Sequence, residues 1–297
     1  MRRFAVVFAL GALWALPSSA HQKTFFMPQI PNPDKMVIDG QDDDWGWIDP
    51  AFAITPDGLF DVYGGPWPPP KDDWDVIAYV AWSSPPDNAL YYFARVTDDS
   101  LGLFNDDPQS YWKDDALEII TDSDHSSENF IETEMTTGQQ YGIRIKAAPG
   151  QSPVHIFNVP QQSILWSTKE PYFIFRWTLD PPDAEPLKQS PGTTVTYTYE
   201  VKQWTWDFHD KNGPDGSKRH LFAPDQVFGL TFQFDEAENP EAGASVQGGT
   251  SPVDGAWQDN SLGSDFITVA TEGATGGSGV TAVESDSWGR IKTYMTR

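Results

Sequence analysis

Glycine and proline interrupt this chain every few residues, and this punctuation is the feature that most limits its fold. The 297 residues include 24 Gly and 25 Pro, and helical periodicity is almost absent between them. The segments that remain are short and rich in β-branched and aromatic residues, which predicts ten strands. The predicted strands are 36–38, 75–82, 89–97, 116–121, 129–136, 141–146, 172–179, 193–202, 226–235 and 264–270. Without a break in composition, they predict an all-β fold with a single β-sandwich.

Three segments between these strands are too long for ordinary connections in a compact domain. Residues 49–73 and 180–192 are rich in proline, and residues 207–225 are polar. Such loops are expected to be functional loops at the rim of the sandwich, or mobile ones. Residues 271–284 form a linker rich in Gly, Ser and Thr. The C-terminal segment 285–297 carries three apolar residues at helical spacing, which indicates a short docked helix or a recognition tail.

The amino terminus has the features of a secretory signal peptide. Arg2 and Arg3 precede an apolar run over 4–16, and the small residues 18–20 follow Pro17. We therefore expect cleavage after Ala20 and a secreted, periplasmic or extracellular protein. The mature chain would then have an extension at 21–33 and a domain at 34–270. Cysteine is absent from the sequence, so no disulfide is expected.

The composition argues against negatively charged partners. The formal net charge is −24, and such a surface repels nucleic acid and anionic lipid. No apolar segment after the leader is long enough to span a membrane. The acidity has two interpretations, which are solubility outside the cell and Asp clusters that hold a hard cation. The 13 Trp, 18 Phe and 10 Tyr are set among polar and turn residues, which favours a neutral partner.

The stretch 109–124, QSYWKDDALEIITDSD, combines a Trp, two Asp and a Glu with a short apolar run. In a strand over 117–121, Leu117 and Ile119 share one face, and Glu118 lies on the other between apolar neighbours. A carboxylate in such a place needs hydrogen-bond partners, so it binds either an Arg or the hydroxyls of a ligand. Trp112 lies in the loop that enters this strand and can stand at the rim of the sheet.

Eight motifs in order resemble the family 9 carbohydrate-binding modules of the DOMON-like superfamily, over residues 34–270. They are IDGQDDDW at 38–45, VIAYVAW at 76–82, LYYFARVTDDS at 90–100, YWKDDALEIITD at 111–122, YGIRI at 141–145, TYTYEVKQW at 196–204, FGLTFQFDEAE at 228–238 and AWQDN at 256–260. The resemblance implies a β-sandwich whose rim holds the end of a β-glucan or xylan chain between two Trp rings. It implies no catalysis, and a partner glycoside hydrolase or a cell-surface assembly is a further expectation.

The family's sugar-binding positions can be matched to residues of this sequence. The matches are Trp112, Glu118, Arg144, Gln233 and Trp257. One position departs from the family, since Lys146 stands where an Asn can contact sugar. The chemistry agrees, because a pyranose offers apolar C–H faces to flat rings and hydroxyls to bidentate side chains. A structural explanation also stands, in which the Trp rings belong to the core and Glu118 forms a buried ion pair with Arg144.

Three other functions are compatible with parts of the sequence. A haem-binding electron-transfer domain, known among DOMON-like relatives, would draw its ligands from Met36, Met135, Lys146, His155 and His209. A glycoside hydrolase would pair Asp114 or Asp115 with Glu118. A copper-dependent oxygenase would use His21 as the amino terminus after cleavage, but nothing else in the sequence matches that class.

Aspartates cluster at expected strand ends and in tight turns, where their like charges repel unless a cation lies between them. The candidate calcium ligands are Asp39, Asp42, Asp98, Asp99, Asp122 and Asp124, with Asp43 and Asp44 beside the first pair. Calcium accepts carboxylates from irregular loops, and the family resemblance also implies structural calcium. Aspartate is common in turns for other reasons, so capping of exposed turns is the alternative.

Overall fold

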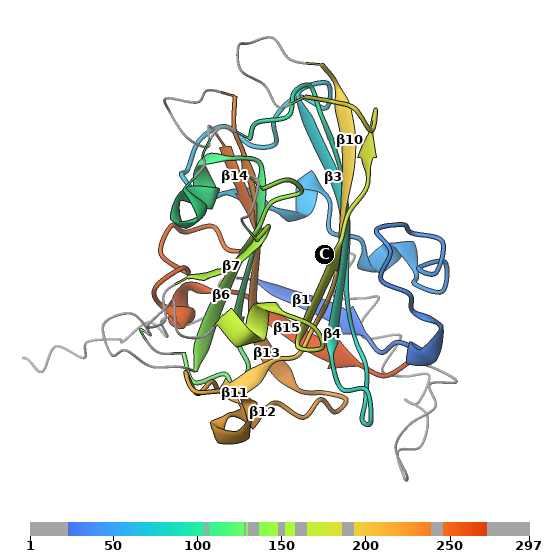
Figure 1. Cartoon of the computed structure of the whole chain (residues 1–297), viewed down its shortest axis with the longest axis vertical. Helices are drawn as coiled ribbons and strands as arrows, with labels where there is room; N and C mark the ends of the chain where they lie inside the picture. The colour runs from blue at the N-terminus through green and yellow to red at the C-terminus, as the bar shows by residue number, and fades with distance from the viewer. Residues whose placement is uncertain are drawn as a thin grey trace, which may run out of the picture.

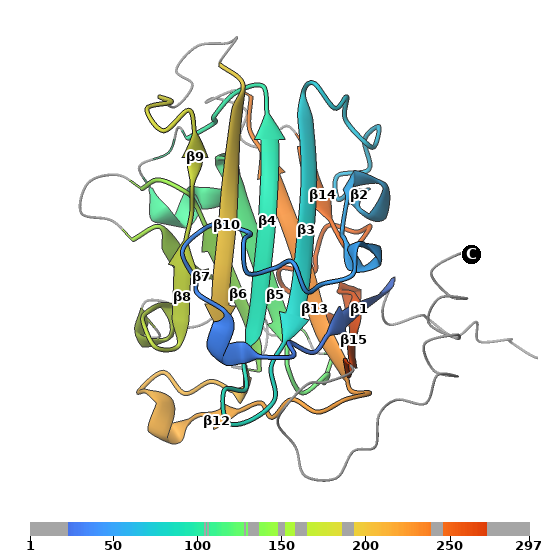
Figure 2. The ribbon, with the colours of Figure 1, turned by 90° about the vertical axis from the view of Figure 1, so that its right-hand side faces the viewer.

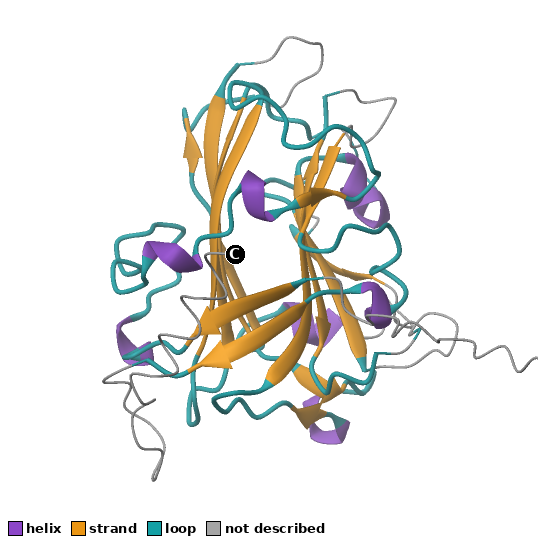
Figure 3. Cartoon of the chain, turned by 180° about the vertical axis from the view of Figure 1, so that it is seen from behind, coloured by secondary structure: helices purple, strands orange, loops and turns teal. Residues whose placement is uncertain are grey.

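The computed structural model describes residues 23–103, 105, 107–127, 129, 137–147, 152–157, 165–185, 193–238 and 246–271. The predicted signal peptide with its cleavage site, and all of the predicted tail beyond Thr271, lie outside these residues. Strands dominate the described part, and its helical segments are short 3-10 turns around the strands (Figure 3). Within these described ranges, no helix has the length and apolar character to cross a membrane.

The strands form two sheets that face each other as layers (Figure 1). The large sheet has eight strands in the order β1-β15-β13-β5-β6-β7, with β14 beside β13 and β2 beside β14. Its strands are β1 (Thr24–Pro28), β2 (Phe60–Asp61), β5 (Ala116–Asp122), β6 (Gly138–Ile143), β7 (Val154–Phe157), β13 (Val227–Glu236), β14 (Val246–Gly249) and β15 (Asp265–Val269). Neighbouring strands are antiparallel except β1 and β15, which run parallel.

The small sheet has five strands and lies in front of the large sheet in Figure 2. Its order is β3-β4-β10-β8, with β9 also paired to β10. Its strands are β3 (Trp74–Trp82), β4 (Leu90–Asp98), β8 (Phe173–Arg176), β9 (Leu179–Asp180) and β10 (Val195–Gln203). A separate two-stranded ribbon, β11 (Trp206–Phe208) with β12 (Lys218–Arg219), lies at one end of the sandwich.

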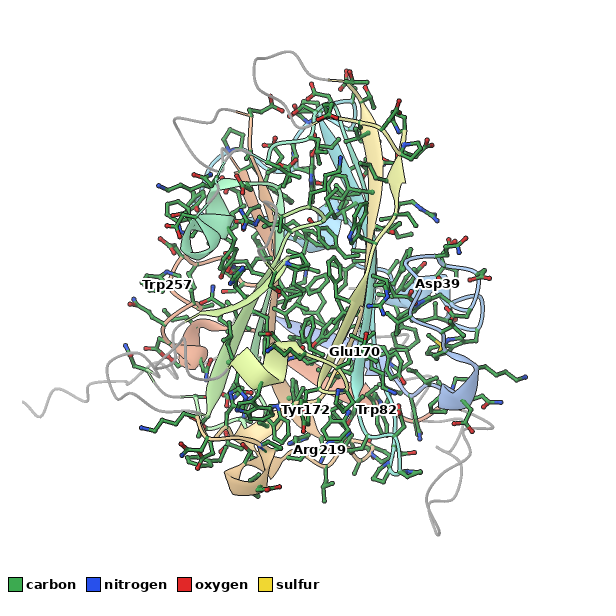
Figure 4. All side chains as sticks on the ribbon, viewed as in Figure 1. Asp39, Trp82, Glu170, Tyr172, Arg219 and Trp257 are labelled. Atoms are coloured by element: carbon green, nitrogen blue, oxygen red, sulfur yellow. The ribbon has the colours of Figure 1, made fainter. Side chains whose placement is uncertain are left out.

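Aromatic and aliphatic side chains fill the space between the layers (Figure 4). On β5, Leu117 and Ile119 point into this core, as the alternation predicted. Across it, the ring of Tyr92 on β4 stacks on Phe232 of β13 with centroids 5.7 Å apart. Burial of this apolar surface, about 25 cal/mol per Å², stabilises the sandwich and leaves the opposite face of β5 free for polar side chains.

The motif at 38–45 covers the outer face of the small sheet. Trp45 donates from Nε1 to Oε1 of Glu200 on β10 at 2.9 Å, and the backbone amides of Asp39 and Gly40 donate to Oε2 at 2.8 and 2.7 Å. Burial raises the pKa of Glu200 to about 7. Gly40 has a φ of +90°, and a Cβ there would lie 2.7 Å from the backbone of Trp177. This wrapping places the segment on the side of the sandwich opposite Trp257 (Figure 4).

The predicted all-β sandwich is confirmed, and its longer strands lie where the sequence indicated. Four predicted strands differ. The predicted strand 141–146 lies three residues earlier, as β6. Residues 36–38 form no strand, because the backbone amide of Val37 donates to Asp44 instead, at 2.6 Å. The predicted strand 172–179 is divided into β8 and β9, and the predicted strand 129–136 lies outside the described residues except for Asn129. Residues 24–28, expected in an extension before the domain, form β1 in the large sheet.

Candidate functional site

The outer face of the large sheet carries a row of polar side chains. Glu118 on β5 lies opposite Gln233 on β13 and opposite Gly142 on β6. Gln140 and Asp235 lie two residues farther along β6 and β13, and so share this face. All of these side chains are nearly inaccessible to solvent, so they are covered by other parts of the chain.

Hydrogen bonds tie these polar side chains to one another. Gln140 donates from Nε2 to Oε2 of Glu118 at 2.6 Å, and Gln233 donates from Nε2 to the same oxygen at 3.2 Å. Gln247 on β14 donates from Nε2 to Oδ1 of Asp235 at 2.6 Å, and the carboxyl of Asp235 contacts that of Glu118. These side chains therefore form one hydrogen-bonded network, in which the carboxyl groups of Glu118 and Asp235 are in contact.

Burial sets the acid–base properties of this carboxyl pair. Burial raises the pKa of Glu118 to about 7, against hydrogen bonds from Gln140 and Gln233 that lower it. Burial also raises the pKa of Asp235 well above its ordinary value, and the neighbouring charge of Glu118 adds to the rise. Two carboxylates in contact repel unless a proton or a cation lies between them, so the pair retains a proton near neutral pH.

Aromatic side chains surround this polar floor and leave a pocket of about 370 Å³. Its lining residues are Tyr63, Tyr111, Trp112, Glu118, Gln140, Gln233, Gln247, Asp254 and Trp257. The two Trp come from distant segments, since Trp112 lies in η4 (Pro108–Lys113) and Trp257 lies before η8 (Asn260–Leu262). Their side chains are 38% and 36% exposed, so each ring presents apolar surface that no protein group covers. Trp257 donates from Nε1 to Oδ1 of Asp254 at 3.0 Å, which fixes its ring.

Tyr111 separates the pocket from the rest of the polar face. Its ring lies directly over Gly142, where an added Cβ would come within 2.2 Å of the ring carbons. Gly142 stands between Gln140 and Arg144 along the chain, so the ring occupies the gap between their side chains on this face. Only a glycine leaves room for that approach. Gln140 therefore lines the pocket, and Arg144 lies beyond the ring.

Arg144 is paired with Asp114 and does not line the pocket. Its Nη1 donates to Oδ2 of Asp114 at 2.7 Å and to the backbone oxygen of Asn105 at 2.6 Å. Both side chains of the ion pair are buried, at 2% and 0% exposure. The alternative pairing of Arg144 with Glu118 was wrong, because Asp114 in the turn before β5 is its partner.

The other sequence-predicted site residues lie together. Trp112, Glu118, Gln233 and Trp257 all line the one pocket. The carboxylate of Asp115, a candidate for hydrolysis, accepts the backbone amides of Gly102 and Ala237 at 2.5 and 2.9 Å instead. Sequence reasoning missed five lining residues, which are Tyr63, Tyr111, Gln140, Gln247 and Asp254. Gln140 could have been found from the alternation of side chains along the strand before YGIRI.

Two carboxylate groups that could hold a cation lie near the ends of β4 and β13. One consists of Asp73, Asp99 and Glu238, and the other of Asp98, Glu236 and Glu238, with ligand atoms within 4.8 Å of one another in each. The carboxyl of Glu238 contacts those of Asp99 and Glu236. Burial raises the pKa of Asp98 to about 8. Asp98 and Asp99 were predicted from the sequence, whereas Asp73, Glu236 and Glu238 were not.

The four other predicted calcium ligands have protein partners instead. Asp39 accepts the backbone amide of Gln41 at 2.9 Å, and Asp42 forms an ion pair with Arg95 at 2.7 Å. Asp122 accepts the amides of residues 126 and 127 at 3.0 and 2.9 Å, and Asp124 accepts the hydroxyl of residue 126 at 2.7 Å. These four belong to neither carboxylate group, so turn capping and an ion pair account for them.

The described candidates for haem ligands each have different neighbours in the structure. Met36 packs against the aromatic cluster on the outer face of the small sheet. Lys146 donates to the backbone oxygen of Ala184 at 2.8 Å, and His155 contacts the backbone oxygen of Ser152 at 2.8 Å. His209 is buried against the rings of Trp166 and Trp206, and burial lowers its pKa to about 3. Met135 and His21 lie outside the described residues.

Comparison with known proteins establishes the fold. No protein-family model matches the chain, and its sequence matches no curated protein. Among solved structures, it is similar to a family 9 carbohydrate-binding module from Caldicellulosiruptor kristjanssonii in complex with cellotriose, with a TM-score of 0.54 and 16% identity. A structure of such a module from the same organism in complex with glucose gives a TM-score of 0.55 at 16% identity. Each match covers 87% of this chain and 100% of the module. The chain therefore has the fold of the family 9 modules, as its sequence motifs predicted.

Proposed function

We propose that this protein binds the end of a β-glucan or xylan chain in the pocket between Trp112 and Trp257, without cleaving it. The observation that carries the proposal is the convergence of these two rings, from segments far apart in the sequence, on one pocket with a hydrogen-bonding floor. A sugar ring has apolar faces and a polar edge. Flat rings at the walls and Glu118 with Gln233 at the floor suit both features.

The carboxyl groups of the site support binding over hydrolysis. Glycosidases hold their two carboxyl groups about 5 to 9.5 Å apart, so that a sugar or a water fits between them. Here Glu118 and Asp235 are in hydrogen-bond contact, and Asp114 and Asp115 are held by Arg144 and by backbone amides. The modules with the same fold were solved with cellotriose and with glucose, which agrees with a neutral glycan as ligand.

Calorimetric titration with a panel of soluble glycans tests the proposal. Two partly exposed rings and a few hydrogen bonds contribute only a few kcal/mol beyond the cost of association, so we expect a Kd of about 1 μM to 1 mM. The panel should include cello-, xylo- and laminari-oligosaccharides, with a polyglucuronate as a charged control that an acidic pocket rejects. Absence of heat with every glycan would contradict the proposal.

We also propose that calcium binds between the carboxylates of Asp98, Asp99 and Glu238, with Asp73 and Glu236 in reach. The fit rests on geometry, because carboxyl groups in mutual contact need a cation or a proton between them. Calcium takes six to eight oxygens in irregular loops. When bound, it would cross-link the end of β4 to the end of β13, and so join the two sheets.

Calcium is therefore expected to raise the melting temperature. At about 100 times its Kd, a ligand that binds only the folded state contributes about 2.7 kcal/mol. For a domain of this size, that corresponds to an increase of about 5 to 10 °C. The measurement is a thermal melt in millimolar calcium against one in EDTA, with magnesium as the control ion. A melting temperature that is the same in both, and unchanged in Glu238→Gln, would contradict the calcium proposal.

A further inference from the structure

The titratable side chains with a carboxyl group outnumber the basic ones at the pocket. Among its lining residues, Glu118 and Asp254 are acidic and none is Lys, Arg or His. Asp235 is outside the pocket lining and contacts Glu118. The guanidinium of Arg144 is neutralised by Asp114 on the far side of the Tyr111 ring. A cation near the rim is Lys113, whose Nζ lies 5.0 Å from the centre of the Trp112 ring. Glu118 and Asp235 retain a proton between them near neutral pH, but no basic residue of the lining offsets Asp254, so a ligand on the floor meets an acidic surface.

Several N–H donors at the pocket are already bound to its carboxylates. Gln140 and Gln233 direct their amide nitrogens to Glu118, and Gln247 directs its own to Asp235. The indole N–H of Trp257 donates to Asp254. Each of these side chains thus directs an N–H to a carboxylate, while Glu118 and Asp254 offer a ligand acceptor oxygens. Hydroxyl groups can satisfy such a floor, but an ammonium group brings three donors and no acceptor.

The walls add a third feature that favours a cation. Tyr63, Tyr111, Trp112 and Trp257 surround the acidic floor, and all but Tyr111 are more than a third exposed. The face of an aromatic ring attracts a nearby ammonium through its quadrupole. Aromatic walls over a carboxylate floor therefore suit a sugar that carries a protonated amine better than a neutral sugar.

We propose that the pocket selects amino sugars, and that a glucosamine unit of a β-1,4-linked chain binds it more tightly than a glucose unit. This inference rests on the proposed glycan binding and names the substrate class of the same site. The amine would lie toward Glu118 and Asp254, and the apolar face of the sugar would lie against an indole ring. N-acetylation removes the charge and should remove the preference.

Three disaccharides that differ only at C2 test this inference, namely β-1,4-linked glucosamine, β-1,4-linked N-acetylglucosamine and cellobiose. Calorimetry on the full chain should be carried out at about pH 7, where an amine with a pKa near that of an α-amino group is mostly protonated and Glu118, whose pKa burial raises to about 7, is not fully protonated. We expect the glucosamine disaccharide to bind at least about tenfold more tightly than cellobiose, and the N-acetylated one no more tightly. The difference should shrink in about 0.5 M NaCl, because salt screens charge.

Asp254→Asn should lower the ratio of the affinity for the glucosamine disaccharide to that for cellobiose several-fold. The substitution removes a carboxyl group, while the amide oxygen of Asn can still accept from Trp257. Asp215→Asn, an equal change of charge at an exposed position in η7 (Pro214–Gly216) outside the pocket lining, should leave that ratio as it is. Equal binding of cellobiose and the glucosamine disaccharide would overturn the amino-sugar inference and leave glycan binding intact. Failure of all three disaccharides and of the wider panel would overturn glycan binding itself.

Discussion

Trp112→Ala and Trp257→Ala are each expected to reduce glycan affinity about thirtyfold. A Trp side chain offers about 250 Å² of surface, and the exposed fractions of these two are 38% and 36%. A sugar that covers this exposed part of one ring buries about 90 Å², which corresponds to about 2 kcal/mol. Because the site supplies only a few kcal/mol in total, the loss of either ring should bring binding close to the limit of detection by calorimetry.

Trp177→Ala is the matched control for both substitutions. Trp177 is 37% exposed and lies between β8 and β9 of the small sheet, outside the pocket lining. Its removal takes away the same amount of exposed aromatic surface without touching the proposed site. Thermal melts of all three variants should show that each is folded. Wild-type affinity in both pocket variants, or an equal loss in Trp177→Ala, would contradict the placement of the sugar.

The long strands could be predicted from the sequence because their pattern is local. In β13, Phe or Leu alternates with polar or small residues from Phe228 to Asp235, and β5 is a short apolar run bounded by polar residues; such local patterns predict the strand and the face that enters the core. β14 could not be predicted in this way, since its sequence is VQGG. It is a strand because it pairs with β13 and β2, and Gly248 leaves room for Trp67, since an added Cβ there would lie 2.4 Å from its ring.

The site residues that a strand or a family motif identifies could be predicted from the sequence. Glu118 and Gln233 follow from their strands, Trp112 follows from the family motif just before β5, and the pocket brings all three together with Trp257. Arg144 was not predictable, because two aspartates precede Glu118 and the sequence does not say which of the three carboxylates the guanidinium will face. That choice depends on Tyr111, which fills the space over Gly142, and on Asn105, which joins the ion pair.

The carboxylate groups illustrate a different limit. The sequence pointed to clusters of adjacent Asp, but adjacent residues on a strand lie on opposite faces. The oxygens that converge come from separate segments, namely Asp73 before β3, Asp98 at the end of β4, and Glu236 at the end of β13. The spacing of Glu236 and Glu238 places both on one face, so the motif FDEAE contained a signal that the pairs of Asp obscured.

Asp114→Ala is expected to destabilise the fold by about 3 to 5 kcal/mol. The substitution leaves the guanidinium of Arg144 buried at 2% exposure without its counter-ion, and an uncompensated buried charge costs that amount. Asn105 loses a partner as well, since its backbone amide and Nδ2 both donate to Oδ1 of Asp114, at 3.0 and 2.9 Å. The expected fall in melting temperature is about 10 °C.

The exposed ion pair between Arg176 and Glu170 provides the control. Its N–O distance is 2.9 Å, but the side chains are 50% and 60% exposed, so Glu170→Ala should cost less than about 1 kcal/mol. The double variant Asp114→Leu with Arg144→Met should recover much of the stability, because apolar side chains can replace a buried ion pair. An equal cost for Asp114→Ala and Glu170→Ala would show that the Arg144 charge is not buried as described.

The same ion pair should also affect the ligand. The backbone amide of Asp114 donates to the oxygen of Tyr111 at 2.9 Å, so the ion pair anchors the turn that carries Tyr111 and Trp112 to the pocket. At a temperature well below the melt, Asp114→Ala should therefore still weaken glycan binding, although no atom of Asp114 lines the pocket. The double variant should recover stability more fully than affinity, because packing alone does not restore the hydrogen bonds that Asn105 makes to this turn. Recovery of both to the same extent would show that the ion pair acts on the pocket only through the stability of the fold.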